Sequence, residues 1–82
     1  METKQIKLNT PEEVIDFVKA AEQCDFDIDL YYNRIIVDAK SFLGIMSLDI
    51  SKILNISYYG HNSKLESIIQ KYAVRKETAG AL

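Results

Sequence analysis

The chain contains no tryptophan, one cysteine, one proline and one histidine among its 82 residues. A single cysteine excludes an internal disulfide or a cysteine-based metal cluster, and we expect the Cys24 thiol to be buried at a helix end. No run of apolar residues approaches the roughly eighteen needed to span a bilayer, and the amino-terminal residues are polar, unlike a signal peptide. We therefore expect a cytoplasmic protein.

An excess of charge of one sign is also lacking. The net charge of −2 gives no electrostatic reason to expect nucleic-acid binding, and no basic run indicates contact with an anionic membrane surface. With 48% hydrophobic residues, the composition is typical of a globular chain long enough for one core. We predict one domain over residues 1–74 and a frayed tail over residues 75–82, where the periodicity fades.

Hydrophobic periodicity and helix-start signals predict four strands and three helices. At the first helix, Thr10 suits the N-cap, Pro11 the first helical position, and Glu13 completes a capping box. A turn at residues 33–34 fits a tight hairpin because Asn33 tolerates a positive φ. In chain order we expect a strand at 3–8, a helix at 11–23, strands at 26–32 and 34–38, a helix at 41–48, a strand at 50–59 and a helix at 63–72.

This β-α-β-β-α-β-α order predicts an α+β fold, an open-faced β-sandwich with helices covering one face of the sheet. The other face should be wet and carry Asp27 and Asp29. Together with Asp25 these carboxylates could indicate a metal site, but alternating acids on the solvent face of a strand are commoner, so we predict no metal. Ser63 and Glu66 should form a capping box at the third helix.

The stretch from Asp38 to Leu48 combines a helix start with closely spaced apolar residues. Ser41 suits the N-cap of this short helix. Phe42 and Ile45 can share one face, whereas Leu43 and Met46 belong to a second face. Two apolar faces exceed what one core contact needs. We therefore expect Phe42, Leu43 and Met46 to form an exposed patch that binds a partner protein.

Residues 40–48, Lys-Ser-Phe-Leu-Gly-Ile-Met-Ser-Leu, closely resemble the second helix of HPr, the histidine-containing phosphocarrier of the bacterial sugar phosphotransferase system. The Gram-positive form of HPr reads Lys-Ser-Ile-Met-Gly-Val-Met-Ser-Leu there. Phe17-Val18-Lys19 resembles part of the first HPr helix, and the element order agrees over residues 3–73. The resemblance implies an HPr-like domain, an antiparallel sheet in the order 1-4-2-3, and three helices on one face.

HPr carries its phosphoryl group on a histidine at the start of the first helix, in the motif Gly-Leu-His-x-Arg-Pro-Ala. Aligned on residues 17–19, Thr10 takes the place of that histidine, Glu12 that of the arginine and Glu13 that of the proline. His61 would follow the fourth strand at the opposite pole, where we expect a solvated turn residue. The resemblance therefore implies that the phosphocarrier reaction is lost, and we expect no enzymatic activity, no catalytic residue and no cofactor.

In Gram-positive HPr, and in a paralogue that lacks the histidine and acts in catabolite repression, the serine matching Ser41 is phosphorylated by a dedicated kinase. The resemblance thus makes Ser41 a candidate regulatory site. A serine at a helix start also has a purely structural use as a cap.

Three hypotheses follow from these patterns. The first is a non-catalytic regulatory or adaptor domain whose partners are phosphotransferase-system components, a serine kinase or a sugar-responsive regulator. The second is a phosphocarrier with an altered acceptor. The third is a domain that self-associates or binds a small ligand through the open sheet face. We adopt the first.

Overall fold

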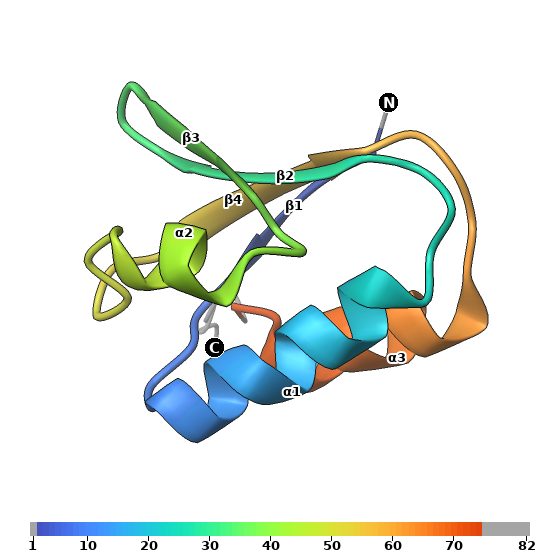
Figure 1. The fold of residues 1–82 in the computed structure, drawn as a ribbon, viewed down its shortest axis with the longest axis horizontal. Helices are drawn as coiled ribbons and strands as arrows, with labels where there is room; N and C mark the ends of the chain where they lie inside the picture. The colour runs from blue at the N-terminus through green and yellow to red at the C-terminus, as the bar shows by residue number, and fades with distance from the viewer. Residues whose placement is uncertain (1, 75–82) are drawn as a thin grey trace, which may run out of the picture.

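The computed structural model describes residues 2–74, and its order of strands and helices is the predicted one (Figure 1). The predicted tail at 75–82 lies outside the described residues. The elements are β1 (Glu2–Ile6), α1 (Pro11–Glu22), β2 (Ile28–Tyr32), β3 (Ile35–Asp38), α2 (Phe42–Met46), β4 (Leu54–Tyr58) and α3 (Ser63–Tyr72).

The four strands form one antiparallel sheet in the order β1-β4-β2-β3, which confirms the predicted topology. All three helices lie on one side of this sheet, with α1 and α3 side by side and α2 nearer to the β2–β3 hairpin (Figure 1). The register places Ile6 opposite Leu54 and Leu30 opposite Ile56. Residues opposite each other point to the same face, so these pairs give the sheet an apolar face toward the helices.

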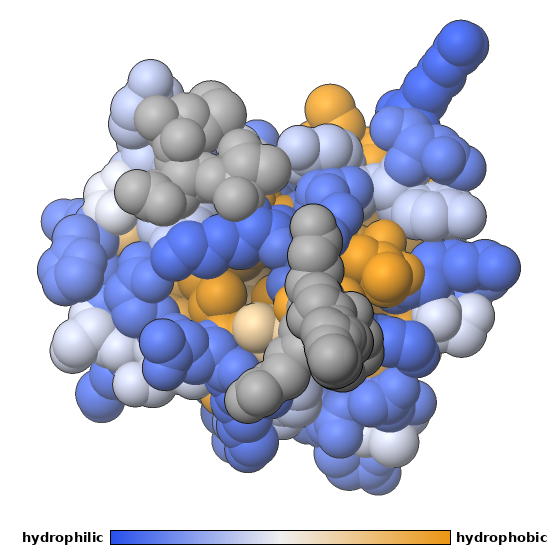
Figure 2. Space-filling view, turned by 180° about the vertical axis from the view of Figure 1, so that it is seen from behind, coloured by the Kyte–Doolittle hydropathy of each residue, from blue (hydrophilic) through white to orange (hydrophobic). Residues whose placement is uncertain are grey.

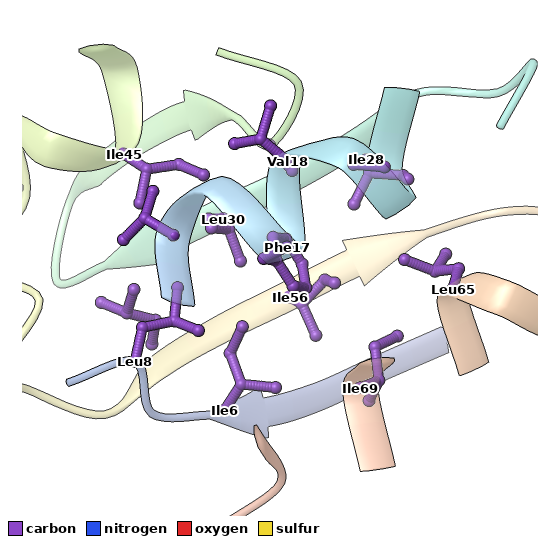
Figure 3. Packing of buried hydrophobic residues seen from close by; sticks show 14 of the residues in the cluster. Ile6, Leu8, Phe17, Val18, Ile28, Leu30, Ile45, Ile56, Leu65 and Ile69 are labelled. Carbon is purple, nitrogen blue, oxygen red and sulfur yellow. The ribbon is translucent and has the colours of Figure 1, made fainter. Parts of the chain in front are cut away.

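The core fills the space between this apolar sheet face and the helices (Figure 3). The spacing of Val14, Phe17 and Ala21 puts all three on one face of α1, and all three are fully buried. α3 contributes Leu65 and Ile69 in the same way. Seen from behind, the surface is mostly hydrophilic, and hydrophobic residues reach it in separate groups (Figure 2).

The predicted strand at 50–59 is wrong in its first half. Asp49 Oδ1 accepts hydrogen bonds from the Ser51 amide at 3.1 Å and from its hydroxyl at 2.6 Å. The Lys52 amide donates to the Asp49 carbonyl at 3.1 Å. These bonds fold residues 49–52 into a turn, because an aspartate side chain competes for nearby backbone donors. Pairing with β1 starts only at Leu54.

The predicted capping box at the third helix is also wrong. Asn62 is the N-cap of α3, and its side-chain oxygen accepts from the amides of Lys64 at 2.9 Å and Leu65 at 3.0 Å. The Glu66 carboxylate instead accepts from the Tyr58 hydroxyl at 2.7 Å. A charge-assisted tertiary bond is stronger than a local backbone contact, so Glu66 turns toward the sheet.

Other predicted ends shift by a few residues. β1 ends at Ile6, two residues early, although Leu8 is buried. β2 starts at Ile28, and Phe26 before it stacks on the Tyr58 ring with centroids 6.0 Å apart. α2 has five residues rather than eight, because Ser47 already ends it as the C-cap. Burial therefore extends past the hydrogen-bonded elements, which is why hydrophobic periodicity overestimates their length.

Candidate functional site

The amino end of α1, where the resemblance places the phosphoryl acceptor, is closed by its own side chains. Thr10 is the N-cap, and its Oγ1 accepts from the Glu13 amide at 3.2 Å. Glu13 Oε1 accepts from the Asn9 amide at 2.8 Å. In the predicted capping box it would instead accept from the amide of Thr10, the N-cap residue. Glu12 and Glu13 add negative charge to the first turn. This arrangement stabilises a helix dipole, and it repels an anion.

His61 lies at the other end of the molecule. The register pairs Glu2 with Tyr58 and Ile6 with Leu54, so β4 ends beside the start of β1. α1 follows the opposite end of β1 (Figure 1), whereas the exposed His61 follows β4. His61 and the amino end of α1 therefore lie at opposite ends of the sheet, as predicted from the topology.

α2 presents part of the predicted patch to solvent. Leu43 has 78% of its surface exposed, the largest value among the exposed large hydrophobic residues of the described chain. Phe42 and Met46 are half-buried and pack against the core. The opposite side of the helix carries the fully buried Ile45. The patch is therefore one largely exposed leucine flanked by two half-buried side chains that pack against the core.

Two contacts fix α2 against its neighbours. The Lys40 ammonium, just before the helix, donates to the Cys24 carbonyl at 2.9 Å and joins the start of α2 to the end of α1. The second contact is the packing of α2 on β3, where the fully buried Ile45 faces the core and the half-buried Val37 of β3 packs against that core. A five-residue helix is unstable alone, and these tertiary contacts hold its exposed face in place.

Ser41 is the predicted N-cap of α2. Its Oγ accepts from the Gly44 amide at 3.0 Å, and the residue is half-buried. Its backbone is extended, with φ of −111° and ψ of 110°. The hydroxyl therefore lies at the amino end of the helix that carries Leu43, and it accepts a backbone hydrogen bond there.

Ile15, an exposed hydrophobic residue on α1, was not predicted from the sequence. Asp16 on the α3 side of α1 bonds Tyr72, so the stripe through Ile15 and Val18 faces away from α3. α1 contacts α2 as well as α3. Its position in the sequence is consistent with this exposure. Ile15 lies outside the spacing of Val14, Phe17 and Ala21, so it is an apolar residue of α1 that does not pack in the core.

The ionisable groups with the clearest hydrogen-bond partners stabilise the packing of helices and strands. The Tyr58 hydroxyl, together with the Lys4 ammonium at 3.0 Å, holds the pKa of Glu66 below its ordinary value despite partial burial. Hydrogen bonds from Tyr72 at 2.8 Å and from Lys71 at 3.2 Å likewise lower the pKa of Asp16. Both carboxylates attach α3 to its neighbours and lie outside the α2 patch.

Cys24 is buried just after α1, as predicted, and burial raises the pKa of its thiol. A raised pKa reduces the thiolate fraction, so the geometry gives no sign of an activated nucleophile.

The predicted wet face of the sheet is open, and Asp25, Asp27 and Asp29 are exposed there or beside it. Across residues 2–74, no three His, Cys, Asp or Glu side chains are grouped as metal ligands would be. Nor is any helix in that range long and apolar enough to cross a membrane.

A groove of about 580 Å³ runs between α1 and α3. Its lining includes Lys19, Lys64 and the Lys71–Asp16 ion pair. It is an open groove rather than an enclosed cavity, and differs in this from a typical small-molecule site.

Solved structures similar to this chain are phosphocarriers. A phosphocarrier protein HPr from Bacillus anthracis str. Ames superimposes with a TM-score of 0.69 at 25% identity, covering 87% of this chain and 95% of that one. The chain has an HPr-like fold. HPr-C-His from Thermoanaerobacter tengcongensis gives a TM-score of 0.67 at 25% identity, with 87% and 93% coverage.

No family model matches the sequence, and no curated protein matches it significantly. The HPr-like fold therefore rests on the three-dimensional agreement. It relates the chain to proteins of the HPr phosphocarrier type.

Proposed function

We propose that this protein is a non-catalytic regulatory or adaptor domain that binds proteins of the phosphotransferase system, or a sugar-responsive regulator, in the cytoplasm. The contact surface is the α2 patch of Phe42, Leu43 and Met46. The observation that carries the proposal is the exposure of Leu43 on a helix held in place by Ile45 and Lys40. A large apolar side chain presented on an anchored helix is typical of a protein-binding anchor, because the backbone that carries it is already ordered before it docks.

The amino end of α1 supports a loss of phosphocarrier chemistry. A phosphoryl group arriving there would meet the carboxylates of Glu12 and Glu13, whereas a phosphocarrier needs a nucleophile and a cation. Thr10 already uses its hydroxyl as the helix cap. An alkyl hydroxyl is also a far weaker nucleophile than an imidazole when no base activates it.

Ser41 is the proposed switch, with a serine kinase as the modifying partner. Phosphorylation would add a charge of about −1.5 to −2 beside Leu43. A partner that buries Leu43 would then have to desolvate a phosphate, or supply an arginine to pair with it. The modification would thus exchange one class of partner for another without changing the fold.

The loss of phosphotransfer can be tested by incubation with phosphoenolpyruvate and the general phosphotransferase enzyme of the sugar system. We expect no gain of mass, while an HPr in the same mixture gains about 80 Da, the mass of one phosphate. A stable phosphoryl group on Thr10 or His61 would instead show a phosphocarrier with an altered acceptor.

Binding is tested with the same phosphotransferase enzyme and its relatives as labelled probes. We expect Leu43→Asp to weaken binding at least about tenfold, as loss of a buried anchor does. Tyr59→Asp is the matched control, because Tyr59 is 70% exposed and follows β4, outside the α2 patch. Equal effects of the two substitutions would refute the α2 patch.

A further inference from the structure

The two edges of the sheet differ in how they are covered. Along β1, the Val74 amide donates to the Gln5 carbonyl at 3.1 Å and the Lys7 amide donates to the Tyr72 carbonyl at 3.0 Å. The segment after α3 therefore shields that edge. Within residues 2–74, no strand or segment pairs in this way with the outer side of β3.

β3 is also apolar and exposed. Ile36 has 67% of its surface in solvent and Ile35 has 52%. The strand lies in the β2–β3 hairpin at the margin of the sheet, away from α3 (Figure 1). An open edge with exposed β-branched residues is the arrangement that proteins usually avoid, because it offers a template for another strand.

The hairpin register identifies the backbone groups that point outward. A two-residue turn joins Tyr32 to Ile35, and the pair that closes such a turn is hydrogen-bonded. Bonded and non-bonded pairs alternate in an antiparallel ladder, so the Tyr31–Ile36 pair is non-bonded. Ile36 therefore directs its N–H and C=O away from β2, toward the open edge.

The sequence of this edge is complementary to itself. Antiparallel pairing of two copies with Ile36 opposite Ile36 lets these residues exchange both backbone bonds across a two-fold axis. The same register places Ile35 of each copy opposite Val37 of the other, and it brings Arg34, in the turn just before β3, beside Asp38 of the other copy. Pairing shifted by two residues would put Asp38 or Arg34 opposite Ile36 and lose both charge pairs.

A second observation concerns Asp38. It lies directly opposite Asp29 in a non-bonded pair of the β2–β3 register, and its Oδ1 accepts from the Lys40 amide at 2.9 Å. Like charges directly opposite each other destabilise a sheet. Neither carboxylate has an ion-pair partner within residues 2–74. An arginine from a second copy would supply the missing cation at this position.

We propose that this protein forms a symmetric homodimer through β3, which joins two sheets into one continuous eight-stranded sheet. The Ile36 backbone groups and the two Arg34–Asp38 pairs fix the register. The α2 patch stays free because it faces the helical side of the sheet. The strand has four residues, so the contact is small and the dimer weak and concentration-dependent.

Sedimentation velocity up to about 1 mM protein, where even millimolar affinities are detected, tests the dimer. We expect wild type to dimerise. Arg34→Asp and Asp38→Arg should each weaken dimerisation at least about tenfold, since each reverses two ion pairs of the symmetric contact. An equimolar mixture of the two variants should dimerise again, because every facing pair is then of opposite charge. Lys64→Asp, a charge reversal at an exposed residue of α3, is the matched control.

Circular dichroism of each variant confirms that it is folded, and Ile36→Lys provides a disruption that leaves both charges unchanged. The proposal is overturned if wild type stays monomeric, or if Ile36→Lys has no effect on a wild-type dimer. It is also overturned if the mixture of charge variants does not recover association.

Discussion

Gly60 shows how one residue without a side chain allows a close packing contact. It lies two residues after β4 with φ of 144°, a conformation that residues with a Cβ atom rarely adopt. An added Cβ would overlap the Phe26 ring, at 2.6 Å from its Cγ. Phe26 in turn stacks on Tyr58 with an interplanar angle of 20°. The glycine therefore allows the backbone after β4 to contact the Phe26 ring closely.

We expect Gly60→Ala to destabilise the protein by about 3 kcal/mol, combining backbone strain with overpacking. Urea unfolding measures the loss. In a Phe26→Leu background the same substitution should cost less, because the leucine leaves part of the space of the ring. Equal costs in the two backgrounds would show that the ring does not cause the strain.

At the scale of single elements, α2 depends on its cap more than a longer helix would. It has five residues, and Ser41 satisfies one of its free amide donors. The proposed switch and the cap therefore use the same oxygen atom.

Ser41→Ala should cost about 1 kcal/mol in urea unfolding, the usual value of a lost N-cap. Ser41→Asp should cost much less, because aspartate is an equally good N-cap residue. If the proposed switch is correct, Ser41→Asp will nevertheless alter partner binding as a permanent negative charge beside Leu43. A binding change with Ser41→Ala as large as that with Ser41→Asp would indicate a structural effect instead of a charge effect.

At the scale of the whole molecule, two carboxylates connect α3 to the rest of the protein. Glu66 receives the Tyr58 hydroxyl of β4 and the Lys4 ammonium of β1. Asp16 of α1 receives the Tyr72 hydroxyl at the end of α3. Both groups are held as anions by these donors, so attachment of α3 depends on pH.

The pKa of Glu66 is lower in the folded chain than its ordinary value of 4.5. Its contribution to stability is therefore complete above pH of about 4.5 and is lost as the pH falls through the folded value. The same sign holds for Asp16. We expect Tyr58→Phe to lower the urea midpoint at pH 7 and to lower it much less at pH 2.5. An equal loss at both pH values would mean that the substitution acts through packing alone.

The residues by themselves determined the order of elements, the antiparallel hairpin at Asn33, the caps at Thr10 and Ser41, and the burial of Cys24. These features follow from local chemistry or from the period of apolar residues, and both are written in neighbouring positions. The resemblance in residues 40–48 further predicted the sheet order.

Only the tertiary structure decided the partner of Glu66, the turn at Asp49, the exposure of Ile15 and Ile36, and the covering of β1 by Val74. Each depends on groups distant in sequence or on competition between a local bond and a distant one. For the same reason, periodicity identified β3 as a strand but could not show that no segment of residues 2–74 covers its outer edge. That edge is decided by where the rest of the chain goes.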